Sequence, residues 1–363
     1  MKVKLTEICT PKQWKTIPAN ELLDEGYPVY GANGIIGYYD KYNHENPVVT
    51  ITCRGATCGT VNITEPKSYI TGNAMCLDNV RPDILLEYLY YCLLHYDFSN
   101  VISGSAQPQI TRQGLEKVKI AICSIEEQNK RTSSLRKIST VIAARQQQLQ
   151  KLDELVKARF VEMFGDPQTN PKGYEKRKLG LLAKKISDGV HAKPEYTETG
   201  RPFLSVVNIN KGIINFEGCK FVSEEAYQKM IKSTHPERGD VLYTKVGATY
   251  GIPAYVDTDT EFCLYVSVCL IKPKHDEIDS RFLALSMSMP YIKRQADSRI
   301  KGIGVPDLHL NQISEFDILC PPREEQELFV AFVEQVDKSK VAVQKALDEA
   351  QLLFDSLMQK YFG

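Results

Sequence analysis

The sequence of 363 residues repeats itself at an offset of 198 residues, and this duplication constrains the fold more than any other feature. The tripeptide Glu-Glu-Gln at 126–128 returns at 324–326, and Phe164-Gly165 returns as Phe362-Gly363. Without any gap, Pro108 also corresponds to Pro306. Solenoid repeats are only about 20 to 50 residues long, so a single repeat of this length predicts two copies of a domain-sized unit.

Composition places the chain among ordinary globular proteins. Hydrophobic residues make up 43% and charged residues 25% of the sequence, and the length suffices for two domains with separate cores. No apolar run approaches the roughly 20 residues that span a bilayer, and residues 1–10 lack the apolar stretch of a signal peptide. We therefore expect a cytoplasmic protein without a membrane partner.

Cysteine and histidine follow no pattern typical of a metal centre. Among ten cysteines, the closest pair in sequence, Cys53 and Cys58, has neither a second pair nor a histidine at zinc-binding spacing. The histidines stand alone, without spacing that indicates a metal or a catalytic triad: His44, His95, His191, His235, His275 and His309. The sequence therefore predicts free, mostly buried thiols, no metal site and no catalytic residue.

Each repeat ends in a segment that predicts a long helix. From Gln128 to Gly165 neither proline nor glycine occurs before the last residue, and apolar side chains recur on a seven-residue grid. The same grid, shifted by 198 residues, describes the second copy. Each helix would hold about 37 residues and measure about 55 Å at a rise of about 1.5 Å per residue.

The grid defines an apolar seam on each helix, as in a coiled coil. The expected seam residues are Leu135, Ile138, Ile142, Leu149, Leu152 and Val156 in the first helix, and Val333, Val336, Val343, Leu347, Phe354 and Leu357 in the second. Arg145, Arg159 and Lys340 occupy seam positions and interrupt the pattern, and such interruptions commonly fix the register at some cost in stability.

The two helical segments carry opposite charge. Residues 126–165 contain eight basic and five acidic side chains, whereas residues 322–363 contain five basic and eight acidic ones. Opposite net charge favours pairing of the two helices with each other over pairing of either with itself. We expect an antiparallel coiled coil with pseudo-two-fold symmetry, and the alternative is that each long helix packs on its own domain.

The remaining segments, 1–125 and 166–321, predict two mixed α/β units with short strands, which makes the fold α+β overall. Enrichment in β-branched and aromatic residues predicts strands at 48–52, 118–122, 240–243 and 316–319. Short helices are expected at 85–95 and 281–289, started by Asp83 and Ser280. The chain thus divides into 1–125, 126–165, 166–321 and 322–363.

A glycine-bearing loop follows one strand in each unit. Gly-Ala-Thr-x-Gly occurs at 55–59 and again at 247–251, an offset of 192 residues. Two glycines around a small polar stretch allow a tight turn and close approach of the backbone to a ligand such as a phosphate, although most glycine turns are only turns.

Polar side chains suited to base edges or phosphates gather near these loops in sequence. The candidate DNA contacts are Arg54, Thr57, Gln107, Gln109 and Arg112 in the first unit, and Lys245, Thr249, Tyr250, Arg299, Lys301 and His309 in the second. For each of them, the alternative is an ordinary solvated surface residue.

In this order, and twice over, these motifs resemble the specificity subunits of Type I restriction-modification systems along the whole chain. The resemblance rests on Tyr27–Gly34 with Gly37-Tyr38, both Gly-Ala-Thr-x-Gly loops, Gly104–Ile110, Gly200–Leu204 with Asn208-Ile209, and Pro-x-Glu-Glu-Gln at 322–326. Ser124 stands where the second copy has Pro322.

The resemblance implies two target recognition domains, 1–125 and 166–321, that each read one half of a split double-stranded DNA sequence. The helices 126–165 and 322–363 would be conserved spacers that dock two methyltransferase (M) subunits and, where the host has them, restriction (R) subunits. S-adenosylmethionine would be bound by the methyltransferase subunits, and this chain would hold no cofactor. Because Gln107-Pro108-Gln109 is matched by Val305-Pro306-Asp307, the two domains should read different bases.

Two other readings stay open. A catalytic methyltransferase would need an Asn-Pro-Pro-aromatic or Asp-Pro-Pro-aromatic sequence and a Phe-x-Gly-x-Gly loop, and the chain has none of them; Phe164-Gly165-Asp166 only half-resembles the loop. A nuclease carboxylate followed by Glu-x-Lys and a Gly-x-x-x-x-Gly-Lys-Ser/Thr loop for ATP are absent too. The near-neutral globular segments leave room for a coiled-coil scaffold that binds protein instead of DNA.

Overall fold

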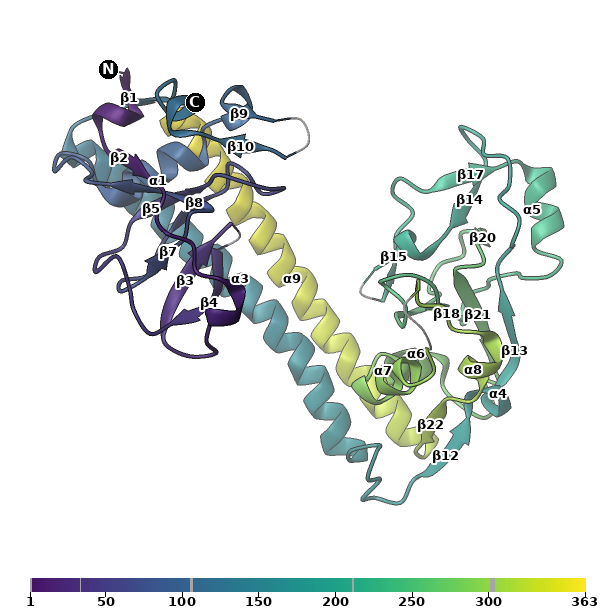
Figure 1. Ribbon diagram of the computed structural model, residues 1–363. Helices are drawn as coiled ribbons and strands as arrows, with labels where there is room; N and C mark the ends of the chain where they lie inside the picture. Colours follow the sequence, from purple (N-terminus) through teal and green to yellow (C-terminus); the bar gives the residue numbers. More distant parts are fainter. Residues whose placement is uncertain (1, 33, 105–106, 211, 301–303) are drawn as a thin grey trace. The chain divides into compact units, whose positions relative to one another are not determined.

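The computed structural model describes residues 2–32, 34–104, 107–210, 212–300 and 304–363 (Figure 1). The chain divides into two compact units. The first comprises Met1–Gln148 together with Val343–Gly363, and the second comprises Leu149–Ala342. The unit boundaries fall inside both long helices, so each unit contains a part of each helix.

The first unit contains two sheets, a pair of outer strands and short helices. Its elements are β1 (Lys2–Lys4), η1 (Leu5–Glu7), β2 (Thr10–Lys12), η2 (Ala19–Glu21), β3 (Tyr27–Gly31), β4 (Gly34–Tyr39), β5 (Val49–Thr52), β6 (Val61–Ile63), β7 (Tyr69–Ile70), β8 (Ala74–Asp78), α1 (Leu86–Leu94), η3 (Phe98–Asn100), β9 (Ile102–Ser103), β10 (Gln109–Ile110), α2 (Arg112–Leu115) and β11 (Lys119–Ala121). The larger sheet has the antiparallel order β2-β8-β5-β6, and the smaller has the order β4-β3-β7 with β3 and β7 parallel. β1 pairs with β11, and β9 with β10.

Strand β5 lies in the interior with all four residues buried. Val49 and Ile51 pack in one cluster with Tyr88 and Leu89 of α1. Because alternate residues of a strand face opposite sides, Thr52 points the other way and donates a hydrogen bond from Oγ1 to Ala32 O at 2.7 Å. Cover on both faces explains why this strand reads as a nearly continuous β-branched run.

The second unit contains more elements. They are β12 (Glu175–Lys178), α4 (Leu179–Leu182), β13 (Ala183–Asp188), β14 (Arg201–Leu204), η4 (Val206–Asn208), β15 (Ile209–Asn210), β16 (Ile213–Ile214), β17 (Lys220–Val222), α5 (Glu224–Met230), β18 (Val241–Thr244), β19 (Pro253–Tyr255), β20 (Cys263–Leu264), β21 (Val268–Pro273), α6 (Ser280–Met287), α7 (Pro290–Asp297), α8 (Leu310–Ser314) and β22 (Asp317–Cys320).

Strand pairing repeats from one unit to the other. The sheet β13-β21-β18-β19 has the order of β2-β8-β5-β6, and β17-β14-β20 has the order of β4-β3-β7, including the parallel outer pair. β12 pairs with β22 as β1 pairs with β11. The duplication seen in the sequence is therefore a duplication of topology, and both units are α+β as expected.

The long helices are α3 (Ile125–Phe164) and α9 (Arg323–Phe362), each 40 residues long. In the first unit Arg131 of α3 donates from Nη1 to Tyr361 O at 2.7 Å. In the second unit Phe160 of α3 packs edge-on against Phe329. Because positions later in α3 meet positions earlier in α9, the helices pair antiparallel, as a coiled coil does.

The residues expected in the seam are buried or half-buried along both helices. The polar residues that interrupt the seam are paired. Lys340 Nζ lies 2.7 Å from Asp153 Oδ1 on the other helix, Arg159 Nη1 donates to Glu162 at 2.8 Å, and Arg145 Nη1 donates to Gln148 at 2.8 Å. In the Lys340–Asp153 pair the lysine lies on α9, which has a net negative charge, and the aspartate lies on α3, which has a net positive charge. The net charges of the two helices therefore do not predict this ion pair.

The repeated Glu-Glu-Gln tripeptide fastens each long helix to its own domain. Gln128 is fully buried, accepts a hydrogen bond from Leu85 N at 2.9 Å and donates to Asp83 O at 2.9 Å. Gln326 is 2% exposed, accepts from Asp279 N at 2.9 Å and donates to Pro321 O at 2.8 Å. This motif is structural in both copies.

The expected short strands and helices are present with small shifts of their ends. The helix-start prediction was wrong in detail, because α1 begins after Leu85 rather than Asp83, and Asp279 rather than Ser280 caps α6 by accepting from Phe282 N at 2.8 Å. Within the described ranges, no helix combines the length and the apolar character needed to cross a membrane.

Candidate nucleic-acid interface

The two Gly-Ala-Thr-x-Gly loops close in the same way. Gly59 N donates to Thr52 O at 2.9 Å, and Gly251 N donates to Thr244 O at 2.8 Å. The first glycine of each loop, Gly55 and Gly247, has a φ of +92° and +86°, a conformation that favours glycine. The recurrence of the sequence at an offset of 192 thus corresponds to one turn built twice.

A second segment is hydrogen-bonded to each glycine loop. In the first unit, Gly55 N donates to Pro108 O at 3.1 Å and Ile110 N donates to Cys53 O at 3.0 Å. In the second unit, Gly247 N donates to Pro306 O at 2.9 Å and Leu308 N donates to Lys245 O at 3.0 Å. We call residues 54–59 with 107–110 the first paired loop, and residues 246–251 with 304–308 the second. Two motifs that lie about 50 residues apart in sequence thereby form one surface in each unit.

All five residues expected to contact DNA from the first unit are exposed. Arg54 and Gln109 lie opposite each other in an antiparallel β-bridge between the two segments, and Gln107 lies two residues before Gln109. Thr57 donates from Oγ1 to Ala32 O at 2.9 Å, which fixes the loop tip. Arg112 is the first residue of α2, whose cap is Thr111. The structure brings these residues to the first paired loop and its margin.

In the second unit Lys245 is not available to DNA, which corrects the sequence expectation. Its side chain is buried, and its ammonium lies 3.5 Å from Asp188 Oδ1 and 3.4 Å from Asp307 Oδ1. Burial raises the pKa of Asp188, and the neighbouring Lys245 partly opposes that rise. Lys245 therefore holds the floor of the second paired loop and does not reach its surface.

Two further residues of the second unit have structural partners. Tyr250 donates its hydroxyl to Asp297, and Lys293 Nζ lies 3.8 Å from the centroid of its ring. Arg299 donates to Gln295 O at 2.7 Å and to Glu315 O at 3.1 Å. Both are half-buried, so they support the surface more than they present groups to a ligand.

The other expected contacts of the second unit divide into two groups. Thr249, at the tip of the second paired loop, and His309, the cap of α8, are exposed. Lys301 lies outside the described residues, so the structure says nothing about it. Asp307 is not among the contacts expected from the sequence. It corresponds to Gln109 at the offset of 198, and its side chain is exposed.

The side chains beneath the two paired loops differ in chemical type. By strand register, Gln13, Cys53 and Gln109 of the first unit correspond to Asp188, Lys245 and Asp307 of the second. In the first unit, Gln13 donates from Nε2 to Gly72 O at 2.7 Å and lies 3.1 Å from Cys53 Sγ. An uncharged hydrogen-bonded floor in one unit thus replaces a lysine between two carboxylates in the other.

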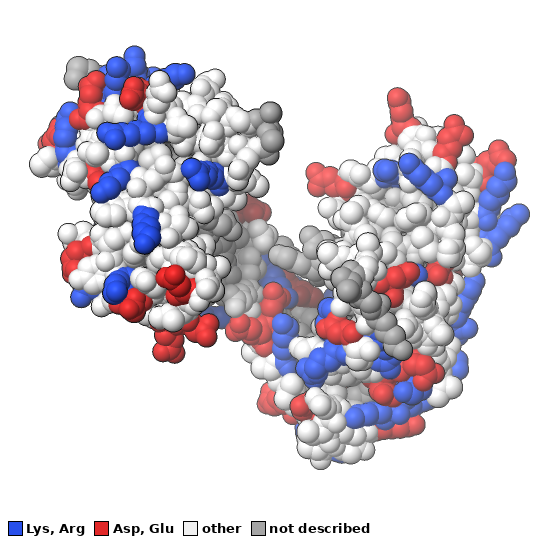
Figure 2. Space-filling view, viewed as in Figure 1, with Lys and Arg blue, Asp and Glu red and all other residues white. Residues whose placement is uncertain are grey.

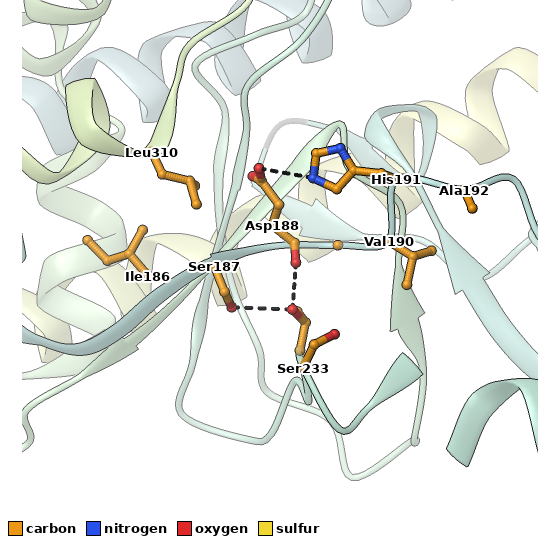
Figure 3. Close-up of a pocket in the computed structure, with 10 residues that line it drawn as sticks. Ile186, Ser187, Asp188, Val190, His191, Ala192, Ser233 and Leu310 are labelled. Atoms are coloured by element: carbon orange, nitrogen blue, oxygen red, sulfur yellow. Dashed lines mark hydrogen bonds and ion pairs between the residues drawn. The ribbon is translucent and has the colours of Figure 1, made fainter. Parts of the chain in front are cut away.

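An open pocket of about 570 Å³ adjoins this floor in the second unit (Figure 3). Asp188 and His191 face each other in it, with 3.8 Å between Oδ2 and Nε2. Thr234 donates from Oγ1 to Asp188 O at 2.5 Å, and Leu310 of α8 completes one wall. The pocket offers a carboxylate, an imidazole and hydroxyl groups, which can accept and donate hydrogen bonds.

Charge is dispersed over the visible surface of each unit (Figure 2). On the first unit, some basic side chains stand alone on uncharged surface and others lie beside acidic ones at its edges, and the second unit also displays both signs. The chain has 45 basic and 45 acidic residues. The visible face therefore offers no single basic patch of the kind that binds phosphates by charge alone.

Two duplicated α+β domains, each ending in a long helix and each carrying a paired loop of exposed polar groups, define a class of two-domain DNA-specificity proteins. The family model for the Type I restriction modification DNA specificity domain matches residues 1–154 and 171–350. The chain belongs to this family, whose members determine DNA sequence specificity.

Relatives and solved structures agree with that assignment. The chain is 23% identical over 288 residues to the MjaVIII specificity subunit of Methanocaldococcus jannaschii, and this alignment covers 71% of this chain and 67% of the relative. It is 30% identical over 129 residues to the EcoprrI specificity subunit of Escherichia coli, and this alignment covers 34% of this chain and 32% of the relative. The crystal structure of an S subunit from M. genitalium matches with a TM-score of 0.63 at 16% identity, over 100% of this chain and 96% of the other.

A structure from a study of complex assembly in the type I R-M system also matches. Its TM-score is 0.55 at 17% identity, over 100% of this chain and 97% of the other. At such identities the likeness establishes the fold.

Proposed function

We propose that this chain reads a bipartite double-stranded DNA target, with one half-site contacted by each paired loop, and performs no chemistry itself. Its partners in this proposal are two methyltransferase subunits and, where the host has them, restriction subunits. S-adenosylmethionine is bound by the methyltransferase subunits, which transfer the methyl group.

One observation carries the proposal: the same hydrogen-bonded paired loop occurs in both units but presents different side chains. Gln109 offers an amide that can both donate to and accept from an adenine edge, and Arg54 offers donors that suit guanine. Asp307, at the place of Gln109, offers only acceptors when ionised and so suits an exposed amino group, as on cytosine. A common backbone with different side chains is what a reader of two unlike half-sites needs.

The dispersed charge supports a requirement for partners. A protein that binds DNA alone through phosphates needs a cluster of basic side chains, because affinity grows with the number of counterions released. Here the exposed Arg54 and Arg112 stand among neutral neighbours on the first paired loop and its margin. Methyltransferase subunits that add phosphate contacts would provide the missing affinity.

Exposed apolar side chains on the long helices support docking of those subunits. Leu155 of α3 and Leu353 of α9, which are related by the 198-residue offset, are 46% and 51% exposed. Leu352 and Val341 of α9 are 72% and 71% exposed. Exposed apolar groups that gather on one element are typical of surfaces that bind protein.

The test is an exchange of one domain. Replacing residues 1–125 by the corresponding domain of another family member should change one half of the methylated sequence and leave the other half intact, because each half depends on its own paired loop. The measurement is methylated-adenine mapping in cells that carry the cognate methyltransferase subunits. Alteration of both halves by this exchange would refute the assignment of one half-site to each unit.

A gel-shift experiment separates the proposal from the protein-binding scaffold. The chain with the methyltransferase subunits should bind cognate duplex more tightly than a duplex with one altered base pair, by about 1 to 3 kcal/mol for each true base contact. Equal binding of both duplexes by the assembled complex would favour the scaffold.

A further inference from the structure

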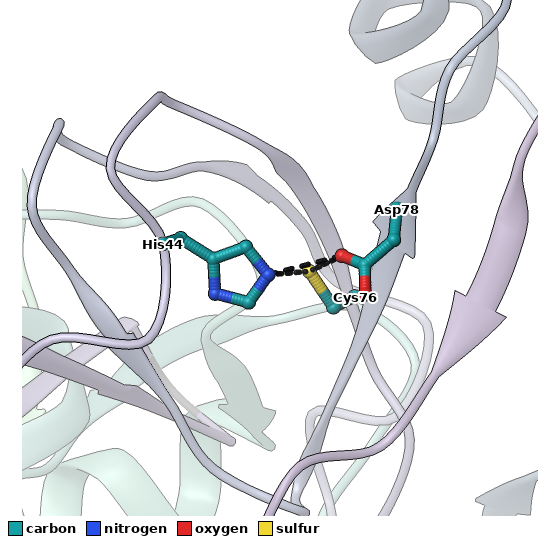
Figure 4. A group of neighbouring side chains, drawn as sticks. All are labelled: His44, Cys76 and Asp78. Carbon is teal, nitrogen blue, oxygen red and sulfur yellow. Dashed lines mark hydrogen bonds and ion pairs between the residues drawn. The ribbon is translucent and has the colours of Figure 1, made fainter.

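His44, Cys76 and Asp78 form a cluster at one end of the larger sheet of the first unit (Figure 4). Asp78 is the last residue of β8, whereas the first residue of β8, Ala74, pairs with Thr52 beside the first paired loop. Cluster and paired loop therefore lie at opposite ends of the sheet. His44 precedes β5 in the chain and is 32 residues from Cys76, so the sequence could not show them as neighbours.

The ligand-type atoms of the cluster are close together and shielded from water. His44 Nε2 lies 3.0 Å from Asp78 Oδ1 and 3.3 Å from Cys76 Sγ, and Cys76 Sγ lies 2.8 Å from the same oxygen. Cys76 is fully buried, and the side chains of His44 and Asp78 are 10% and 14% exposed. The Trp14 ring packs edge-on against the imidazole, with 5.0 Å between centroids.

Both ring nitrogens of His44 face oxygen acceptors. Nδ1 lies 2.7 Å from Asn43 Oδ1, and that amide is oriented by Ile70, whose N–H donates to Oδ1 at 2.9 Å and whose carbonyl accepts from Nδ2 at 3.0 Å. Nδ1 must therefore carry a hydrogen, and in a neutral imidazole Nε2 would present a lone pair to the Asp78 carboxylate. Nε2 thus faces both the Asp78 carboxylate and the Cys76 thiol, and a metal ion held there would be bound by all three groups.

The second unit places a cation at the equivalent position of its sheet. By strand register, Asp78 corresponds to Lys272. The Lys272 ammonium lies 2.7 Å from both Glu237 Oε2 and Asp240 Oδ2. One copy of the fold thus supplies a permanent cation from its own chain, and the other brings three metal-ligating groups within 3.3 Å of one another at that position.

We propose that His44, Cys76 and Asp78 bind a zinc ion in the first unit. An imidazole nitrogen, a thiolate and a carboxylate are the donors that Zn²⁺ takes in proteins. At zinc bond lengths of about 2.0 to 2.3 Å, tetrahedral ligands lie about 3.3 to 3.6 Å apart. The three atoms now lie 2.8 to 3.3 Å from one another, so binding has to move them apart by up to about 0.8 Å. A solvent molecule is the fourth ligand.

Binding exchanges a proton for the metal. The Cys76 thiol loses its proton to solvent, so the ion binds a thiolate, the Nε2 atom of a neutral imidazole and a carboxylate. The ion would join the segment before β5 to β8 and stabilise the first unit.

The test uses the full chain, purified with chelator and then titrated with zinc. Calorimetry should give one zinc per chain and a higher melting temperature. Cys76→Ser and His44→Gln should each weaken binding by at least about tenfold, since even losing a group behind a ligand costs about 10- to 100-fold. Cobalt replaces zinc as a spectroscopic probe, and a thiolate-to-cobalt charge-transfer band should appear with the native chain and disappear with Cys76→Ser.

Matched controls keep the result interpretable. Cys219→Ser and His191→Gln change a half-buried thiol and an exposed imidazole in the second unit and should leave zinc binding and the cobalt band unchanged. Asp78→Asn provides a third variant should one of the others fail to fold. Absence of saturable zinc binding to the native chain, or a cobalt band that survives Cys76→Ser, would overturn the proposal and leave the three side chains as a hydrogen-bonded cluster.

Discussion

Gln128 and Gln326 are the clearest repeated residues, yet their buried amides hold the backbone instead of a ligand. Each stands in the first turns of a long helix and accepts a hydrogen bond from the backbone N–H of Leu85 or Asp279, at the start of a short helix, which would otherwise lack this partner. Lys245 is a second case, because a lysine beside a glycine loop resembles a phosphate contact in sequence but is buried between two carboxylates. Whether such a side chain is structural or free to bind depends on its burial and on its hydrogen-bond partners. The residue type at one position of the sequence does not reveal either.

The first prediction of stability concerns these glutamines. Gln128→Ala or Gln326→Ala should lower the free energy of unfolding, since each buried polar group left without a partner costs about 1 to 3 kcal/mol. Urea unfolding followed by circular dichroism measures the loss. Gln147→Ala, at an exposed position of α3, is the control and should change stability by less than about 0.5 kcal/mol. An equal effect of all three substitutions would contradict the structural role.

At the scale of elements, each long helix begins in one domain and ends against the core of the other. α3 begins in the first unit, where its Gln128 is buried, and its last turns place Phe160 and Phe164 in the core of the second. α9 begins in the second unit, where its Phe329 is buried, and its end places Met358 and Phe362 against the first. These helix ends are therefore held by packing in the cores of the two units as well as by the pairing of α3 with α9.

Phe160→Ala should destabilise the second unit strongly. The ring is 1% exposed and contacts the rings of Phe282 and Phe329, so its removal leaves a cavity at a cost of about 3 to 5 kcal/mol. Hydrogen exchange of the β18 and β21 amides should accelerate in proportion. The neighbouring Val161, which is 51% exposed, provides the control as Val161→Ala. A cost below about 1 kcal/mol for Phe160→Ala would mean that the end of α3 does not belong to this core.

At the scale of the whole molecule, the two halves of the sequence are not the two compact units. A cut after Gly165 removes the end of α9 from the first unit and the end of α3 from the second. The exposed polar residues that differ between the paired loops, by contrast, lie wholly within one half or the other. The chain thus keeps its two paired loops separate in sequence, while the core of each unit includes parts of both long helices.

Separately expressed fragments 1–165 and 166–363 should therefore associate when mixed, because each supplies the helix end that completes the core of the other. Opposite net charge selects the partner, and apolar burial provides most of the affinity, since exposed ion pairs contribute only about 0.2 to 1 kcal/mol each. Co-purification and sedimentation velocity measure the complex.

Two aspartate substitutions on α9 test the cause of that association. Leu347→Asp, at a half-buried seam position, should abolish the complex, whereas Leu352→Asp, at a position that is 72% exposed, should not. A stable 1–165 homodimer, or no complex between the native fragments, would contradict this account.

Sequence alone determined the duplication, the two long helices, their seam and the family resemblance, because these depend on local or periodic patterns such as the repeat of 198 residues and the heptad grid. The turns at Gly55 and Gly247 were also predictable, since a tight loop with positive φ selects glycine. These features need no knowledge of which distant segments meet.

Only the tertiary structure decided which polar groups share a site. Antiparallel and parallel pairings between distant strands joined Arg54 to Gln109, buried Lys245 with Asp188 and Asp307, and brought His44 beside Cys76. Such contacts depend on strand order and register, and a shift by one residue would turn each side chain to the other face of its sheet. For this reason the repeat could be read from the chain, whereas the floor of each paired loop and the His44–Cys76–Asp78 cluster could not.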